Sequence, residues 1–286
     1  MITTISNGKL QISVDSFSAQ LFSIKDAQQE YLWQRDPAYW GNCCPVLFPY
    51  VGRMENGTYY LDGQAYQILH HGFARQMEFA LTAQSENRLE YTLTDCAETY
   101  EAYPRHFVFR VIYTLVENRL DVTYQVENKD EKTMYFGLGA HPGFRVPLEE
   151  GEKFEDFCLE FTVDKAKQMD FNEKSLISAV YDYPLPDKRL PLAHNLFDKD
   201  ALLLTEAGHR VMLKKDDTTV LRVDFPQMDY IVFWHPPKTE APFVCIQPWC
   251  SVPAWAGEVT VFEERKDLLT LQSGSVYENT WSVTVG

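Results

Sequence analysis

Apolar and polar residues alternate in short segments along this whole chain, and Gly, Asn, Asp and Pro separate the segments. In the stretch 89–94 the alternation is strict, and the stretch 120–127 repeats it after a turn at 117–119. A period of two residues is typical of strands with one face toward water. The intervening stretch 107–116 has apolar residues on both faces, so we expect a strand buried on both sides. The three segments together predict an antiparallel meander.

The same pattern extends over most of the chain, whereas helical periodicity is hard to find anywhere. Residues 146–200 are more polar and irregular, and we expect them to form mostly long loops over one sheet face. No Gly/Ser-rich or Pro-rich linker divides the chain. We therefore expect an all-β fold with few short helices, in which residues 1–286 form a single β-sandwich domain. The further strand candidates are 9–14, 19–24, 134–136, 156–162, 210–214, 218–225, 230–235, 243–247 and 280–285.

Composition excludes several classes of protein. With 286 residues, of which 45% are hydrophobic, the chain can bury a large core. No run approaches the roughly twenty apolar residues of a membrane helix, and the first residues lack the order of a signal peptide, so we expect a soluble, cytoplasmic protein. A formal net charge of −15 argues against nucleic acid as a partner. Six cysteines without a Cys-x-x-Cys spacing indicate reduced, mostly buried thiols and no zinc site.

The stretch 137–145 carries the first candidate for chemistry. Two glycines break the expected strand 134–136, so that His141 arrives where the chain must turn, with Pro142 behind it and Arg145 close by. A histidine at a strand end is well placed to donate or accept a proton in a cleft floored by a sheet. The alternative is a histidine whose nitrogens are satisfied by hydrogen bonds within the turn.

Two loops in the first third of the chain carry polar groups that packing explains poorly. The apolar run before Gly52 ends in Arg53, which is either a ligand-binding residue or a surface cation near Glu55. In the second loop His70 and His71 stand against a glycine, and Phe73, Ala74 and Arg75 follow at once. A glycine after His71 allows the close approach of a ligand or of backbone. There is no third histidine at a metal-ligand spacing, so no metal is expected here.

Two loops in the last third complete the set. Residues 194–200 contain Asp198, whose carboxylate either binds a ligand or is a helix cap or a solvated loop charge. The strand candidate 243–247 ends in Gln247, Pro248 and Trp249. Trp249, with Trp234 and Trp255 nearby in sequence, could offer a flat apolar wall, although core packing is the commoner use of tryptophan.

The motifs of serine hydrolases, P-loop nucleotidases, Rossmann enzymes and zinc proteases are all absent. Histidines and arginines on the loops of a β-sandwich suit polar, hydroxyl-rich ligands. The order of the motifs resembles the aldose 1-epimerase (galactose mutarotase) superfamily, and its LacX-like branch in particular. The motifs that carry the resemblance are Phe48-Pro49 with Gly52-Arg53, His71-Gly72-Phe73-Ala74-Arg75, Gly139-Ala140-His141-Pro142-Gly143-Phe144, Phe197-Asp198 and Cys245-Ile246-Gln247-Pro248-Trp249.

The resemblance implies a β-supersandwich of large antiparallel sheets, with a sugar bound in a groove on one sheet and no metal or organic cofactor. It implies interconversion of the α and β anomers of an aldose, with His141 as the general acid at the ring oxygen. His71 would hydrogen-bond near the same oxygen, and Arg53 and Asp198 would bind sugar hydroxyls. Arg75 and Trp249 complete the expected binding residues, and we expect a monomer or homodimer whose partner is a small sugar.

One residue departs from the family pattern. Where the family has a glutamate that serves as the base, this chain has Gln247, and a neutral carboxamide cannot take up the proton of the anomeric hydroxyl. Two hypotheses follow: a mutarotase acting on a free or phosphorylated hexose, or a sugar-binding or sensing protein without turnover. Arg75 and Arg145, each just after a histidine motif, are candidates for a phosphate anchor, and the alternative is that both pair with loop carboxylates.

Overall fold

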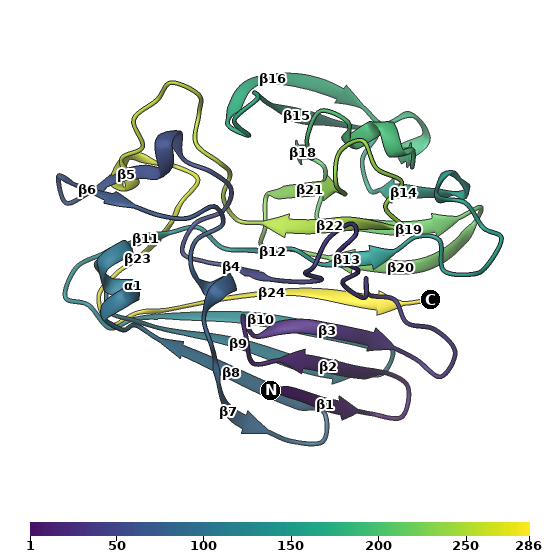
Figure 1. The fold of residues 1–286 in the computed structure, drawn as a ribbon, viewed down its shortest axis with the longest axis horizontal. Coiled ribbons are helices and arrows are strands. Elements are labelled where there is room, and N and C mark those ends of the chain that lie inside the picture. Colours follow the sequence, from purple (N-terminus) through teal and green to yellow (C-terminus); the bar gives the residue numbers. More distant parts are fainter.

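The computed structural model describes all 286 residues and consists mainly of antiparallel strands in two large sheets and three small ones (Figure 1). The larger sheet crosses the lower half of Figure 1 and continues upward on the right, and the one α-helix, α1 (Ala97–Ala102), lies at its left end. In spatial order it contains nine strands: β17 (Arg189–Pro191), β14 (Phe157–Phe161), β19 (Arg210–Lys215), β20 (Thr218–Asp224), β24 (Val276–Val285), β10 (Arg119–Asn128), β9 (Phe107–Val116), β8 (Arg88–Thr94) and β7 (Ala80–Gln84).

The second large sheet has eight strands and lies in the upper half of Figure 1. In order they are β16 (Ile177–Pro184), β15 (Lys165–Phe171), β18 (Leu202–Thr205), β21 (Tyr230–Trp234), β22 (Phe243–Trp249), β12 (Gly139–Ala140) and β4 (Val46–Leu47), and β13 (Gly143–Arg145) also pairs with β22. The small sheets are β1 (Ile2–Ser6), β2 (Gln11–Asp15) and β3 (Gln20–Lys25); β5 (Thr58–Leu61) and β6 (Gln64–Gln67); β11 (Met134–Phe136) and β23 (Leu269–Leu271). Short 3₁₀ turns lie at Glu55–Gly57, Ala74–Gln76, Phe154–Asp156, Pro186–Lys188, His194–Phe197 and Phe262–Glu264.

The predicted all-β antiparallel fold is confirmed, and so is the meander of β8, β9 and β10. Along β10 the side chains alternate strictly between buried and partly exposed, whereas β9 is buried on both faces over most of its length. One hydrophobic cluster of 70 residues contains side chains of both large sheets and of the small sheet of β1, β2 and β3, and it includes residues from both ends of the chain. The division of residues 1–286 into a single domain stays a prediction.

The expectation for residues 146–200 is wrong in one respect, because β15 and β16 form a long hairpin there instead of loops. The sequence does not reveal this hairpin, because β16 is the edge strand of its sheet. Val180 and Tyr181 on β16 are exposed, so apolar and polar residues do not alternate there. The predicted strand 9–14 is β2, shifted by up to two residues. The first strand, β1, was not predicted at all, because only Ile5 of its five residues is buried.

The eight-stranded sheet has one face in the core and another that carries a second, smaller cluster. Neighbouring residues of one strand divide between them: Leu204 faces the large core, and Leu203 joins the small cluster with Val232 and Trp249. This explains why β21 and β22 are apolar on both faces. The small cluster therefore forms a platform on the outer side of the sandwich.

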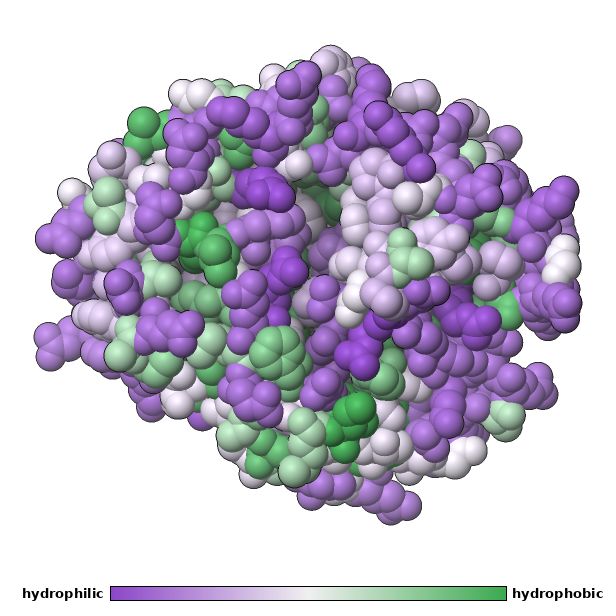
Figure 2. All heavy atoms as spheres, in the orientation of Figure 1, coloured by the Kyte–Doolittle hydropathy of each residue, from purple (hydrophilic) through white to green (hydrophobic).

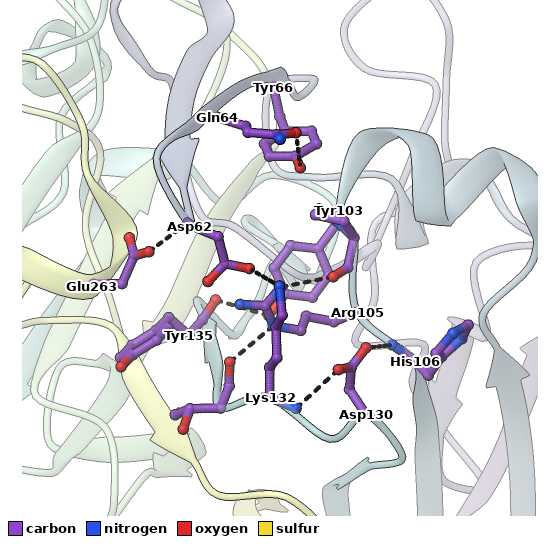
Figure 3. Close-up of polar contacts among 12 residues, drawn as sticks. Asp62, Gln64, Tyr66, Tyr103, Arg105, His106, Asp130, Lys132, Tyr135 and Glu263 are labelled. Carbon is purple, nitrogen blue, oxygen red and sulfur yellow. Dashed lines mark hydrogen bonds and ion pairs between the residues drawn. The ribbon is translucent and has the colours of Figure 1, made fainter.

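A buried arginine ties one of the small sheets to the sandwich. Arg105, 1% exposed, donates hydrogen bonds to the carbonyls of Thr133 and Pro104 and pairs with Asp62, 3.1 Å away, in the hairpin of β5 and β6 (Figure 3). Lys132 pairs with the same carboxylate. This hairpin is thereby fastened to the end of the nine-stranded sheet.

All six cysteines are free thiols, and four of them are buried, as predicted. None of the helices has the length and apolar character needed to cross a bilayer.

Candidate active site

A cleft of about 520 Å³ lies on the outer face of the eight-stranded sheet. Figure 2 shows a hollow over β18 and β21 whose rim is mainly hydrophilic. The floor is formed by β21 and β22, on which Val232 and Gln247 lie directly opposite each other. Four of the five motifs singled out in the sequence contribute residues to the lining, although they are up to about two hundred residues apart in the chain.

The sheet register places His141 opposite Gln247. Gly139 pairs with Trp249 and Gly143 pairs with Cys245 in an antiparallel register, and His141 and Gln247 are the central residues of these two segments. Directly opposite residues in such a register have Cβ atoms about 5 Å apart. The two side chains are therefore held at neighbouring positions in the cleft by the backbone ladder itself.

His141 is 8% exposed and enclosed by aromatic rings. Its ring lies 4.8 Å from that of Trp40, 5.7 Å from that of Trp234 and 5.6 Å from that of His71. Its Nδ1 atom is buried and has no hydrogen-bond partner. Burial, with smaller contributions from the charges of Arg75 and His70, lowers the pKa of His141 to about 3.

His71 has a fixed tautomer. The backbone N–H of Gly52 donates to its Nδ1 atom at 3.0 Å, so in the neutral ring the proton is on Nε2. Burial first, and then the adjacent His70 and His141, hold the pKa of His71 well below its usual value. Gly72 makes this turn possible, because it has a φ of +71° and a Cβ atom there would clash with the carbonyl of Phe48.

Gln247 and Trp249 come from β22, which is buried at every position. Gln247 is 1% exposed, and its Oε1 atom is buried without a partner. Trp249 donates its indole N–H to the carbonyl of Ala140 at 3.2 Å, and a Cβ atom on Gly139 would lie only 2.7 Å from the indole. The indole thus packs closely against the strand that carries His141 into the cleft.

Arg53 and Arg75 both line the cleft, and neither forms an ion pair with a carboxylate. Glu55, the expected partner of Arg53, pairs with Lys174 instead. Arg75 is half-buried, and its burial together with the nearby charge of Arg53 lowers its pKa. Arg145 does not line the cleft, because its guanidinium donates to the carbonyl of Glu30.

Asp198 does not line the cleft either. It is exposed and borders a neighbouring cavity, and the carboxylate that reaches the cleft from this loop is Asp200. Both oxygens of Asp200 are engaged, one by the hydroxyl of Ser175 at 2.6 Å and the other by the backbone N–H of Ala201 at 2.7 Å. Glu173, on the loop between β15 and β16, is the other acidic residue of the lining.

The aromatic wall differs in part from the predicted one. Trp249 and Trp234 line the cleft, whereas Trp255 packs beside the platform outside it. Trp40, which no sequence motif marked, provides the third indole, and its ring meets that of Trp234 edge to face at 5.5 Å. Nowhere in the structure do three or more His, Cys, Asp or Glu side chains form a group suited to hold a metal ion.

The fold and the cleft define a β-sandwich protein of the galactose mutarotase type. A crystal structure of a galactose mutarotase related enzyme from Lactobacillus acidophilus is similar, with 31% identity, a TM-score of 0.93 and coverage of 100% of this chain and 97% of that one. A galactose mutarotase-like protein from Lactobacillus casei ATCC 334 has 27% identity and a TM-score of 0.92, with full coverage of both chains.

The family model of aldose 1-epimerase matches residues 1–284, and the chain belongs to this family. The chromosomal LacX protein of Lactococcus lactis subsp. lactis is 31% identical over 303 residues, which cover 100% of this chain and 99% of that protein. The predicted family and its LacX-like branch are thereby confirmed.

Proposed function

We propose that this protein is a mutarotase that binds a hexose in the cleft and interconverts its α and β anomers by acid and base catalysis. Family membership supports a sugar epimerase in general. The observation that carries the finer proposal is the pair of His71 and His141, whose rings meet edge to face at 5.6 Å in the lining of the cleft. Ring opening needs a proton donor and a proton acceptor on the two oxygens bonded to C1, and such a pair can flank them.

The proposed reaction moves two protons. A base takes the proton of the anomeric hydroxyl, C1 and its oxygen form a carbonyl, and the bond from C1 to the ring oxygen breaks with its electron pair going to that oxygen. His141 then gives its proton to the ring oxygen, and His71 hydrogen-bonds there through its Nε2–H. After rotation about the bond from C1 to C2, the same steps in reverse close the ring on the other face.

The rest of the lining suits a pyranose. Trp40 and Trp234 offer flat faces against which the C–H groups of a sugar ring can pack, while Arg53 and Asp200 supply groups for its hydroxyls. Asp198, proposed from the sequence for this task, borders the neighbouring cavity, and we assign the task to Asp200. No cofactor enters the reaction as written.

A phosphorylated hexose is the form of substrate that Arg53 and Arg75 favour. Both guanidinium groups lack a carboxylate partner, and the half-buried Arg75 gains most from an anion. Calorimetry with glucose and glucose 6-phosphate tests this, because an anchor predicts tighter binding of the phosphate. Equal affinities for glucose and glucose 6-phosphate would contradict a phosphate anchor.

A second candidate function is sugar binding without turnover, and Gln247 is the observation that favours it. A carboxamide can hydrogen-bond a sugar hydroxyl but cannot accept its proton. Exchange spectroscopy on the two anomeric protons of a hexose separates the candidates, since it measures turnover while calorimetry measures binding. A mutarotase predicts exchange above the buffer rate that is lost in His141→Asn and kept in His106→Asn, an exposed histidine far from the cleft. Tight binding with no exchange above the buffer rate would favour the binding protein.

A further inference from the structure

A third histidine, His70, lines the cleft, and neither the family pattern nor the steps above give it a task. Its ring stacks on that of His71 with centroids 3.8 Å apart and planes 28° from parallel. The stacking fixes the plane of the ring and leaves its edge, which carries both nitrogens, free of His71. Whereas Gly52 engages the ring of His71, no hydrogen bond engages the ring of His70.

The surroundings of His70 keep it unprotonated. Burial first, and then the charges of Arg53 and Arg75, lower the pKa of His70 to about 3. At neutral pH the ring therefore presents a lone pair on one nitrogen. A histidine that is half-buried in a ligand cleft and whose ring nitrogens have no protein partners can accept a proton from a bound ligand.

The carboxylates of the cleft are less suited to this task. Both oxygens of Asp200 already accept hydrogen bonds, from Ser175 and from the backbone of Ala201. Glu173 is exposed on the loop between β15 and β16, where water competes for it. Gln247 stands where the family has its base and cannot take a proton.

We propose that His70 is the catalytic base, which takes the proton of the anomeric hydroxyl in place of the glutamate that this chain lacks. This assignment rests on the proposed mutarotase function. The positive charge is conserved in the step: it begins on the imidazolium of His141 and ends on the imidazolium of His70, while the sugar opens to a neutral aldehyde. Ring closure returns the proton from His70 to the oxygen of C1 and the proton of the ring oxygen to His141.

Chemical rescue tests this role. In His70→Gly we expect the exchange rate at saturating sugar to fall about a hundredfold, since a positioned base contributes a factor of about 10² to 10⁴. Added imidazole should restore the rate, and in a series of substituted imidazoles the rescue should rise with the pKa of the base. Imidazole also catalyses anomer exchange in free solution. This background rate is measured in the presence of the His141→Asn protein and is subtracted from the rate with His70→Gly.

A second variant keeps the test valid if the glycine disturbs the turn. His70→Gln removes the base with little change in size, so sugar affinity should stay within about threefold while exchange falls; His106→Gln is the matched control with an unchanged rate. An exchange rate in His70→Gln equal to that of the wild type would overturn the role of His70. So would a His70→Gly protein that still binds sugar but whose exchange rate imidazole does not restore. Either result would leave the mutarotase function standing. A wild-type protein with no exchange above the buffer rate would overturn both.

Discussion

Replacing Gln247 with glutamate should raise the anomer-exchange rate at least about tenfold, which corresponds to about 1.4 kcal/mol of activation free energy. The side chains are nearly the same in size and shape, and Gln247 is 1% exposed in a strand that is buried throughout. The substitution therefore leaves the packing of β22 in place. What changes is the charge, and with it the ability of position 247 to take a full proton.

Two effects of the carboxylate act in the same direction. A carboxylate at position 247 gives the step a second proton acceptor beside His70, and a positioned base contributes a factor of about 10² to 10⁴. The carboxylate also lies across the strand register from His141, whose pKa burial lowers to about 3. A negative charge at this range raises the pKa of a histidine by about 1 to 3 units, so a larger fraction of His141 carries the proton that the reaction needs. The tenfold threshold is cautious because a buried carboxylate also resists ionisation.

Exchange spectroscopy with glucose and galactose measures the rate for both proteins side by side, and the pH titration of the His141 ring signals measures the second effect independently. Gln168→Glu is the matched control, because it adds the same charge on β15 outside the cleft. A Gln247→Glu protein that binds sugar as tightly as the wild type but exchanges anomers no faster would refute the reasoning. In that case position 247 is not the base position of the family.

Three further predictions concern binding and stability. Arg75→Gln should weaken the binding of glucose 6-phosphate by at least about tenfold and that of glucose much less, whereas Arg145→Gln, outside the cleft, should change neither; calorimetry measures both. Because the pKa of His141 is lower in the folded than in the unfolded chain, its contribution to stability is present above about pH 6.5 and lost as the pH falls toward 3. Between pH 7 and 5 the free energy of unfolding in urea should therefore fall by about 2 kcal/mol more in the wild type than in His141→Asn. Arg105→Met leaves two carbonyls without their donor and should lower the free energy of unfolding by about 2–4 kcal/mol. Lys132→Met removes only an exposed ion pair and should lower it by about 0–1 kcal/mol. Similar losses in the two variants would contradict this prediction.

The fold could be predicted where burial leaves a period in the sequence. The strict alternation of β10 and the apolar run of β9 identified both strands, since each side chain either packs in the core or faces water. The hairpin of β15 and β16 left no such period, because the edge strand exposes Val180 and Tyr181, and hydrogen bonds of the backbone hold it whatever the side chains are.

The candidate site could be predicted where a residue belongs to a motif, and its remaining members come from places that carry no motif. His71 and His141 stand beside glycines whose conformation or close packing the turns require, which makes their loops conspicuous. Trp40 and Asp200 are single residues on irregular segments, and only the folded chain brings them to the cleft. The sequence points to Asp198 on the loop 194–200, whereas the carboxylate of this loop that lines the cleft is Asp200, beside Ser175 of the β15–β16 hairpin.

Because Gln247 carries no charge, the charge of the substrate should influence the protonation of the histidines in the cleft. His70 and His141 both have pKa values of about 3, and burial together with nearby guanidinium charge is the cause in each case. A phosphate bound between Arg53 and Arg75 would offset that charge, so it would favour the imidazolium form that the proposed reaction needs. By thermodynamic linkage the reverse also holds, and protonation of the cluster would tighten the binding of the anion. An anionic substrate would thus bring negative charge close to the histidines, where Gln247 carries none, and neutral hexoses would not.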